Sequence, residues 1–426
     1  MLENFKQAAH QLAAQQRVKR VIALCTRLLT EPAEANSVPI ATAIMAKIES
    51  FESEEYHSFF DALATRFNPS AESVLSAARE YAQRPGAQTM IALSKASEPP
   101  RQELFRRLNR APNGTQTLVK LRRRLLSELH RNAEWKAIEF DLLHLLSSWF
   151  NPGFLQMRRV DWNSRAHILE QIIQHEAVHT IDGWDDLRRR LQPDRRCFAF
   201  FHPQLGETPL IFVEVALQTE MPGSIEPLLD KKAEILPANK FKVAAFYSIS
   251  NCEPGLRGVS LGNFLIKHVA NALKEELPQL KTFCTLSPIP SFRTWLERRA
   301  HDDADAKVHS ALSNLGEMAQ LNNAAAIATL SATQRDALTQ LASVYLSRSA
   351  HNEQSDPVAR FHLENGARLE RVNVAANLSA AGIKQSYGTM VNYLYDLEKV
   401  EAQRESFVGG KVSMSRGVAK LCDLNN

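Results

Sequence analysis

The sequence predicts an α+β protein with two domains, an all-helical N-terminal domain followed by a mixed α/β domain. The chain has 426 residues, which is too long for one ordinary hydrophobic core. Apolar residues recur at helical spacing up to about residue 150, and short β-branched or aromatic runs appear after about residue 190. We therefore expect a helical bundle over residues 1–150 and a mixed α/β domain over residues 151–426.

Three apolar stripes predict helices in the first domain, at residues 56–67, 118–129 and 135–149. Turn-forming sequences that contain proline lie at residues 68–69, 112–114 and 151–153. The basic run at residues 122–124 is typical of a solvated helix face. Since no cluster of ligand-type side chains stands out among the stripes, we predict a structural or association role for this domain.

The second domain contains a strand–loop–helix–strand unit. Strand-like runs lie at residues 197–202, 210–217, 243–250 and 282–286. Between the last two, residues 263–276 place Leu265, Val269 and Leu273 on one helical face. Helix-forming sequence then covers residues 291–363, and residues 367–375 alternate as a strand. This order predicts a mixed α/β domain.

The composition is that of a soluble globular protein, with 44% hydrophobic and 23% charged residues. The net charge of +4 tolerates an anionic ligand, but nucleic-acid binding would show a denser basic face. Apolar runs such as residues 210–217, which include Glu214, are far shorter than the ~20 residues needed to cross a bilayer. We therefore expect neither a nucleic acid nor a membrane as a partner.

The cysteines stand singly, at Cys25, Cys197, Cys252, Cys284 and Cys422. This spacing gives neither a disulfide framework nor a zinc ribbon, and it is typical of a reducing cytoplasm. Residues 1–20 lack the apolar core of a signal peptide, so we expect the mature chain to begin near Met1. Cytoplasmic localisation is therefore the expectation.

The loop at residues 251–262 combines glycines and a basic residue ahead of the predicted helix. Gly255, Gly258 and Gly262 free the backbone for tight turns, and a helix N-terminus favours a phosphate. Arg257 and Lys267 add positive charge. The spacing matches neither the P-loop nor the dinucleotide fingerprint. Two interpretations stay open, a phosphate-binding loop and glycines that only make the turn.

His175, Glu176 and His179 match the HExxH zinc motif. Zinc binding requires both histidines on one helical face and a third ligand. Residues 180–183 break the chain directly after His179, and no downstream side chain is marked as a third ligand. We therefore interpret the motif as a chance match and predict no metal site.

Ser287 follows a predicted strand, where ligands of α/β sheets gather. Pro288 excludes it from the helical region and so fixes its hydroxyl. A catalytic or substrate-orienting serine and an ordinary strand-ending turn both fit this pattern.

His362 falls in the last turn of a short predicted helix that Asp356 caps and Asn365-Gly366 ends. The helix dipole favours the imidazolium form there, and a partly protonated histidine suits a general acid. A surface or capping histidine is the alternative. Nothing in spacing or composition joins His362 to Ser287.

Long blocks of the second half closely resemble the malonyl-CoA decarboxylase family. In order over residues 195–399 they are RRCFAFFHP, PLIFVEVAL, AAFYSISNCEPGLRGVSLGNFLIK, LSPIPSF, FHLENGARLERVNVAANLS and GIKQSYGTMVNYLYDLEK. The resemblance implies a helical bundle followed by an acetyltransferase-like (GNAT-type) catalytic domain whose loop binds coenzyme A. The implied reaction converts malonyl-CoA to acetyl-CoA and CO2 through a thioester enolate.

Carried over residue by residue, the resemblance assigns the catalytic serine to Ser287, the proton-donating histidine to His362 and a supporting tyrosine to Tyr395. It assigns the acyl-CoA loop to Arg257, Gly258, Val259, Ser260, Leu261, Gly262 and Asn263. Animal members carry a glutamate at the position of Ser260. No metal or other cofactor is implied, because the thioester itself is the electron sink.

Two other activities stay open on the same fold, an acyl-CoA-dependent N-acyltransferase and a non-catalytic acyl-CoA-binding protein. The helical domain makes a homo-oligomer, a dimer or tetramer, the expected assembly. The chain ends in Leu-Asn-Asn and lacks the peroxisomal Ser-Lys-Leu ending of some animal members, which adds to the cytoplasmic expectation.

Overall fold

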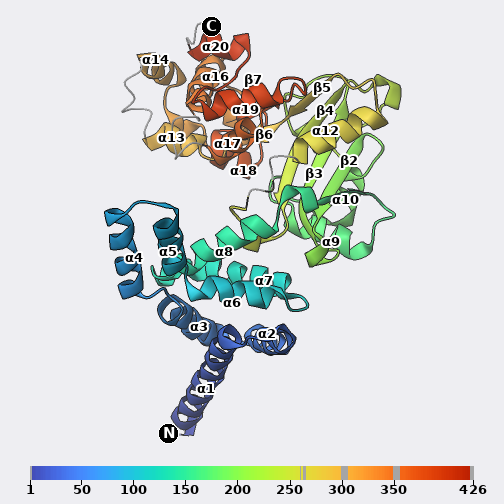
Figure 1. Ribbon diagram of the computed structural model, residues 1–426. Helices are drawn as coiled ribbons and strands as arrows, with labels where there is room; N and C mark the ends of the chain where they lie inside the picture. Colours follow the sequence, from blue (N-terminus) through green and yellow to red (C-terminus); the bar gives the residue numbers. More distant parts are fainter. Residues whose placement is uncertain (1, 260, 262–264, 299–305, 349–355, 423–426) are drawn as a thin grey trace. The chain divides into compact units, whose positions relative to one another are not determined.

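The computed structural model describes residues 2–259, 261, 265–298, 306–348 and 356–422. The chain divides into two compact units (Figure 1). The first unit is Met1–Leu155 together with His202–Gly206 and Glu253–Ser260. The second is Gln156–Phe201, Glu207–Cys252 and Leu261–Asn426. Two short segments from beyond residue 150 therefore belong to the helical unit, and the division at residue 150 remains a proposal.

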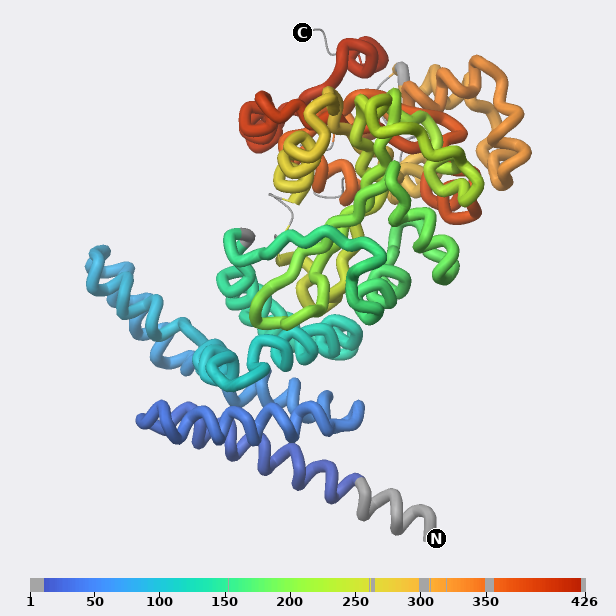
Figure 2. The backbone as a smooth tube through the Cα atoms, turned by 90° about the vertical axis from the view of Figure 1, so that its right-hand side faces the viewer, coloured from blue at the N-terminus to red at the C-terminus, as the bar shows by residue number. Residues whose placement is uncertain are grey.

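The first unit is built from helices that follow one another along the chain (Figure 2). They are α1 Leu2–Thr30, α2 Glu34–Glu49, α3 Ser53–Arg66, α4 Ala71–Gln83, α5 Ala87–Ser97, α6 Pro100–Asn109, α7 Gly114–Glu128 and α8 Trp135–Trp149, with short 3-10 turns η1 Leu129–Arg131, η2 Pro152–Phe154, η3 Pro203–Leu205 and η5 Pro254–Leu256. The three predicted stripes correspond to α3, α7 and α8, so the helical N-terminal region is confirmed.

Apolar side chains of these stripes share one buried cluster, which includes Phe60, Leu121 and Leu142. Helix α3 begins where Glu52 and Glu55 form a reciprocal capping box, which satisfies backbone N–H groups that would otherwise lack partners. Helices α4 and α5 contain no buried residue, although they pack against each other. The core of the unit therefore lies among α1–α3 and α6–α8.

The second unit contains a mixed sheet, which confirms the α+β fold class. In the described residues its strands are β1 Gln156–Val160, β2 Arg195–Phe201, β3 Pro209–Gln218, β4 Val243–Asn251, β5 Thr282–Thr285, β6 Ser287–Pro288, β7 Arg368–Asn373 and β8 Met390–Leu394. The order is β1-β2-β3-β4-β5-β8-β6, with β7 paired to β8. All pairs are antiparallel except β4 and β5, which run parallel. Strands β2 and β3 are buried almost throughout, so apolar side chains occupy both faces of each strand over much of its length.

Helices and turns connect and surround these strands. They are α9 Ala166–His175, α10 Gly183–Arg190, α11 Glu226–Leu229, η4 Ala238–Lys240, α12 Leu265–Glu276, α13 Phe292–Arg298, α14 Ala306–Leu315, η8 Met318–Gln320, α15 Ala324–Ala328, α16 Ala332–Ser347, α17 Pro357–Glu364, α18 Ala380–Ser386, α19 Val400–Val408 and α20 Arg416–Cys422. The predicted strand–loop–helix–strand unit is β4, α12 and β5, since a parallel pair needs a crossover. Across the described ranges, no helix is both long and apolar enough to span a membrane.

Candidate functional site

Ser287 lies two residues after the end of β5, in the two-residue strand β6 that pairs with β8. Its neighbour Leu286 donates its backbone N–H to Phe246 O of β4 at 2.9 Å, which holds this bend against the sheet. The Ser287 side chain is buried. The prediction of a strand ending just before this serine is therefore correct, although Thr285 rather than Leu286 is the last residue of β5.

His362 lies in the last turn of α17, as the helix signals predict. Asp356 caps this helix by accepting the backbone N–H groups of Val358 and Ala359 at 3.0 and 3.1 Å. The other carboxylate oxygen of Asp356 accepts the N–H of Ser291 at 3.0 Å. One buried carboxylate thus joins the helix of His362 to the segment that follows Ser287, and sequence reasoning identified only its capping role.

The second unit brings Ser287, His362 and Tyr395 into one hydrogen-bonded chain. Ser287 Oγ lies 3.0 Å from His362 Nε2, and His362 Nδ1 lies 2.8 Å from the Tyr395 hydroxyl. The Tyr393 ring stacks on the imidazole, with centroids 4.7 Å apart and an interplanar angle of 28°. Residues 75 and 33 positions apart in sequence therefore meet as a unit.

Burial of His362 favours the neutral form of its imidazole. Burial lowers the pKa of His362 from 6.5 to about 3, because the charged form loses its hydration. Burial also raises the pKa of Tyr395 well above its ordinary value. The expectation of a dipole-stabilised imidazolium is therefore wrong for this structure. The helix dipole contributes ~0.3–1 kcal/mol, which is too little to offset full burial.

Of the predicted acyl-CoA loop, the structure describes Arg257, Gly258, Val259 and Leu261. The remaining members, Ser260, Gly262 and Asn263, lie outside the described residues. Gly258 has φ +85°, a left-handed conformation that favours glycine. The Arg257 side chain is exposed.

Arg122 of α7 holds the start of this loop and was missed by sequence reasoning. Its guanidinium donates to Gly255 O and to Arg257 O, both at 2.7 Å, and it pairs with Glu139 at 2.7 Å. Arg122 is only 1% exposed, so its interpretation as part of a solvated face is wrong. Lys267, the other predicted cation, forms an ion pair with Glu401 at 2.8 Å.

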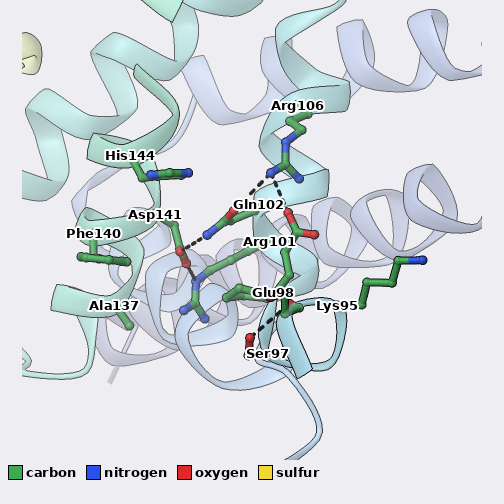
Figure 3. Close-up of a pocket in the computed structure, with 12 residues that line it drawn as sticks. Lys95, Ser97, Glu98, Arg101, Gln102, Arg106, Ala137, Phe140, Asp141 and His144 are labelled. Carbon is green, nitrogen blue, oxygen red and sulfur yellow. Dashed lines mark hydrogen bonds and ion pairs between the residues drawn. The ribbon is translucent and has the colours of Figure 1, made fainter. Parts of the chain in front are cut away.

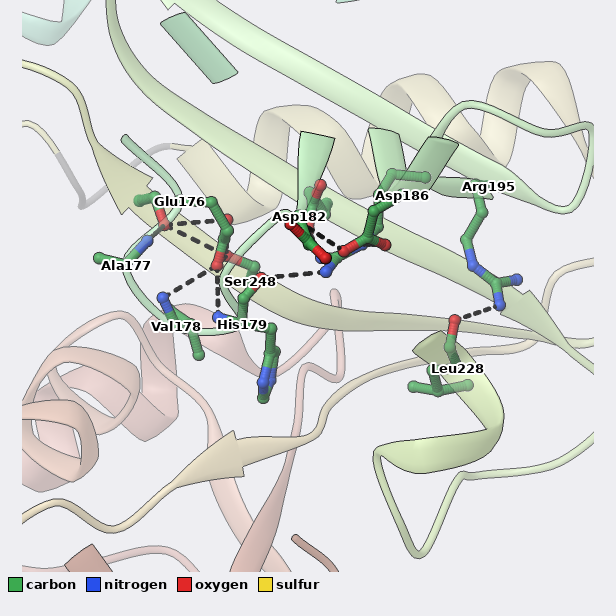
Figure 4. Close-up of polar contacts among 12 residues, drawn as sticks. Glu176, Ala177, Val178, His179, Asp182, Asp186, Arg195, Leu228 and Ser248 are labelled. Carbon is green, nitrogen blue, oxygen red and sulfur yellow. Dashed lines mark hydrogen bonds and ion pairs between the residues drawn. The ribbon is translucent and has the colours of Figure 1, made fainter. Parts of the chain in front are cut away.

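Residues of the HExxH motif form a polar structural contact (Figure 4). Helix α9 ends at His175, so the two histidines do not share a helical face. Glu176 accepts hydrogen bonds from the His179 backbone N–H at 2.7 Å and from Ser248 Oγ at 2.7 Å. It also accepts one from Ser250 Oγ at 3.1 Å. Among the described residues no group of histidine, cysteine and carboxylate side chains is arranged to hold a metal ion.

Pockets occur in both units. The helical unit has one of about 720 Å³, where Arg101 and Gln102 both donate to Asp141 (Figure 3). In the second unit, a pocket of about 400 Å³ is lined by Tyr395, by Phe283 of β5 and by Leu394 at the end of β8. Tyr395 therefore connects this pocket to the Ser287–His362 pair.

Comparisons with known proteins agree on one family. The family models for the malonyl-CoA decarboxylase N-terminal and C-terminal domains match residues 67–150 and 153–426. The mitochondrial malonyl-CoA decarboxylase of Anser anser anser is 35% identical over 72% of this chain and 66% of its own length. This chain thus spans about two thirds of that relative.

Solved structures extend the likeness to three dimensions. The crystal structure of the malonyl-CoA decarboxylase from Rhodopseudomonas palustris has a TM-score of 0.85 and 43% identity, covering 95% of this chain and 99% of that one. The corresponding structure from Agrobacterium vitis has a TM-score of 0.84 and 44% identity, with the same coverage.

Proposed function

Because the chain belongs to the malonyl-CoA decarboxylase family, we propose that it converts malonyl-CoA to acetyl-CoA and CO2 at Ser287, His362 and Tyr395. The observation that supports this site is the hydrogen-bonded chain from Ser287 through His362 to Tyr395 in the interior of the second unit. In such a chain His362 can hold a proton for the substrate, and Tyr395 can replace that proton after it is delivered.

In the reaction the bond between the α-carbon and the carboxyl carbon breaks, and its electron pair passes into the thioester to form an enolate. CO2 leaves, and the α-carbon then takes a proton. The thioester oxygen gains negative charge in this step, so a preorganised donor there contributes most. We assign Ser287 to the carboxylate side of the substrate, since its hydroxyl lies beside the histidine nitrogen that would deliver the proton.

We assign proton delivery to His362 in its neutral form. A carbanion adjacent to a thioester is a stronger base than imidazolate, so a neutral imidazole N–H is acid enough to protonate it. As Nε2 gives up its proton, the Tyr395 hydroxyl at 2.8 Å can supply one to Nδ1. Solvent restores the tyrosine proton when the product leaves. The negative charge of the malonyl carboxylate thus passes from the substrate to the Tyr395 oxygen, and no step needs an imidazolium.

We assign acyl-CoA binding to the loop from Arg257 to Asn263. Its support is the left-handed Gly258, the exposed Arg257 side chain and the buried Arg122 that fixes the loop carbonyls. Backbone held in this way can approach a diphosphate closely, and an exposed guanidinium suits phosphate oxygens.

The test is turnover of malonyl-CoA labelled in its free carboxyl group, with CO2 and acetyl-CoA followed in the presence and absence of an amine. We expect labelled CO2 and acetyl-CoA without any need for the amine. Ser287→Ala and His362→Asn should each lower kcat by a factor on the order of 100 or more, with acetyl-CoA binding retained in calorimetry. Near-normal turnover in either variant contradicts the assigned site, and acyl transfer to the amine without CO2 contradicts the activity.

We also propose a cytoplasmic homo-oligomer that associates through the helical unit. Helices α4 and α5 bury no residue, and Leu75, Met90 and Ile91 on them are about half exposed. We assign these side chains, on two helices that pack against each other, to the association surface. Light scattering after gel filtration should give more than one chain per particle, and replacing these three residues by serine should reduce the measured mass to that of a monomer.

A further inference from the structure

Thr285 closes the hydrogen-bonded chain of the site at the serine end. It is the last residue of β5, it is completely buried, and it lies two positions before Ser287. Ser287 Oγ donates to Thr285 Oγ1 at 2.9 Å. The backbone N–H of Tyr393 donates to the same oxygen at 3.1 Å. Thr285 therefore receives two hydrogen bonds on a side chain that the assigned reaction does not use.

The backbone of Thr285 is equally constrained. Asn392, which is buried in β8, donates its side-chain amide to Thr285 O at 2.7 Å. Because Asn392 and Tyr393 are consecutive residues, β8 fixes both the carbonyl and the hydroxyl oxygen of Thr285. The acceptor that faces Ser287 is therefore held in place by the sheet.

With Ser287 as the donor to Thr285, the number of protons available fixes the direction of the other hydrogen bonds. A serine hydroxyl has one proton, and a neutral imidazole has one N–H. When Ser287 gives its proton to Thr285, it can only accept from His362 Nε2, 3.0 Å away. Nε2 must then carry the imidazole proton, so Nδ1 accepts from the Tyr395 hydroxyl at 2.8 Å.

We infer that Thr285 is a positioning residue that orients the Ser287 hydroxyl and so holds the resting proton of His362 on Nε2. The effect on catalysis rests on the proposed function, since Nε2 is the nitrogen that faces Ser287 and would deliver the proton to the substrate. If Thr285 were absent, Ser287 could donate to Nε2 instead. The proton would then move to Nδ1, where it faces Tyr395 rather than the substrate.

Thr285→Val tests this inference, because valine keeps the shape of threonine and removes the acceptor. We expect kcat to fall by a factor on the order of 10 to 100 with little change in KM, since Thr285 is buried and acts through Ser287. Thr285→Ser should restore most of the activity. The matched control is Thr389→Val, because Thr389 is also fully buried and its hydroxyl has no hydrogen-bond partner among the described residues.

A spectroscopic measurement separates positioning from loss of structure and does not depend on turnover. Nitrogen NMR of 15N-histidine protein, with the His362 signals assigned by their loss in His362→Asn, reports which ring nitrogen carries the proton. We expect an Nε2–H imidazole in the free wild type and in Thr389→Val, and a shift toward Nδ1–H in Thr285→Val. In the Ser287→Ala background, adding Thr285→Val should change neither kcat nor the tautomer.

An unchanged tautomer in folded Thr285→Val, or a kcat equal to that of Thr389→Val, overturns the inference. If the valine variant does not fold, kcat and the His362 tautomer are measured in Thr285→Ala instead. Absence of malonyl-CoA decarboxylation by the wild type would refute the proposed function alone, because the tautomer of the free protein is read without substrate.

Discussion

The pH dependence of kcat is the sharpest test of a neutral His362. Burial lowers the pKa of His362 from 6.5 to about 3, which corresponds to roughly 5 kcal/mol against the charged form. Near neutral pH the imidazole of the free enzyme is therefore almost wholly uncharged. If the neutral N–H delivers the proton, kcat should change by less than about twofold between pH 5 and pH 8, because His362 does not titrate in that range.

An imidazolium donor with an ordinary pKa of about 6.5 predicts a different curve. The protonated fraction would fall roughly 30-fold between pH 5 and pH 8, and kcat would fall with it. The assay is the initial rate of labelled CO2 release at saturating malonyl-CoA, since kcat reports groups in the enzyme–substrate complex. Circular dichroism at each pH controls for unfolding. A 30-fold decline with a midpoint near 6.5 would refute the neutral mechanism.

Three other predictions concern the support of the site. Asp356→Ala removes the acceptor of three backbone N–H groups, so it should lower the free energy of unfolding by roughly 2–4 kcal/mol and also lower kcat. The control is Ser331→Ala at the cap of α16, which should lower the free energy of unfolding by about 1 kcal/mol and leave kcat unchanged. Denaturation and turnover assays measure both variants. Tyr395→Phe should lower kcat at least tenfold because it removes the donor to Nδ1, while Tyr393→Phe keeps the stacked ring and should stay within about twofold of wild type. Dialysis against a chelator should leave turnover unchanged, because Glu176 accepts protein hydrogen bonds, and metal-dependent activity would contradict this.

Sequence periodicity was sufficient to predict the elements whose own residues form an apolar face. The stripes of α3, α7 and α8 each supply an apolar face with a turn at one end, and such a face requires only a partner, not a particular one. The β4–α12–β5 unit was predicted for the same reason. Strands β1 and β8 were not predicted, because β1 is largely exposed and β8 is a five-residue run that pairs with β5 and β6, which lie far away in sequence.

The wrong predictions for His362 and Arg122 arise because residues far away in sequence determine the burial of these two side chains. The local sequence of α17 places His362 at a helix end, but it carries no information about the Tyr393 ring that covers the imidazole. In the same way, Arg122 stands in a basic run that is typical of a solvated face, while the carbonyl oxygens that bind it come from residues 133 and 135 positions later. Burial of a polar group is a tertiary property, so periodicity alone cannot supply it.

An uncharged site also has a chemical advantage for this reaction. A cation beside the substrate would stabilise the malonyl carboxylate in the ground state about as strongly as the enolate in the transition state, and such uniform binding does not increase kcat. A neutral donor such as the His362 N–H gives less to a localised carboxylate and can be aimed at the charge as it moves. Its direction then becomes decisive, because a neutral imidazole donates from one nitrogen only. In this chain that direction depends on Thr285, which accepts the one proton that Ser287 has to give.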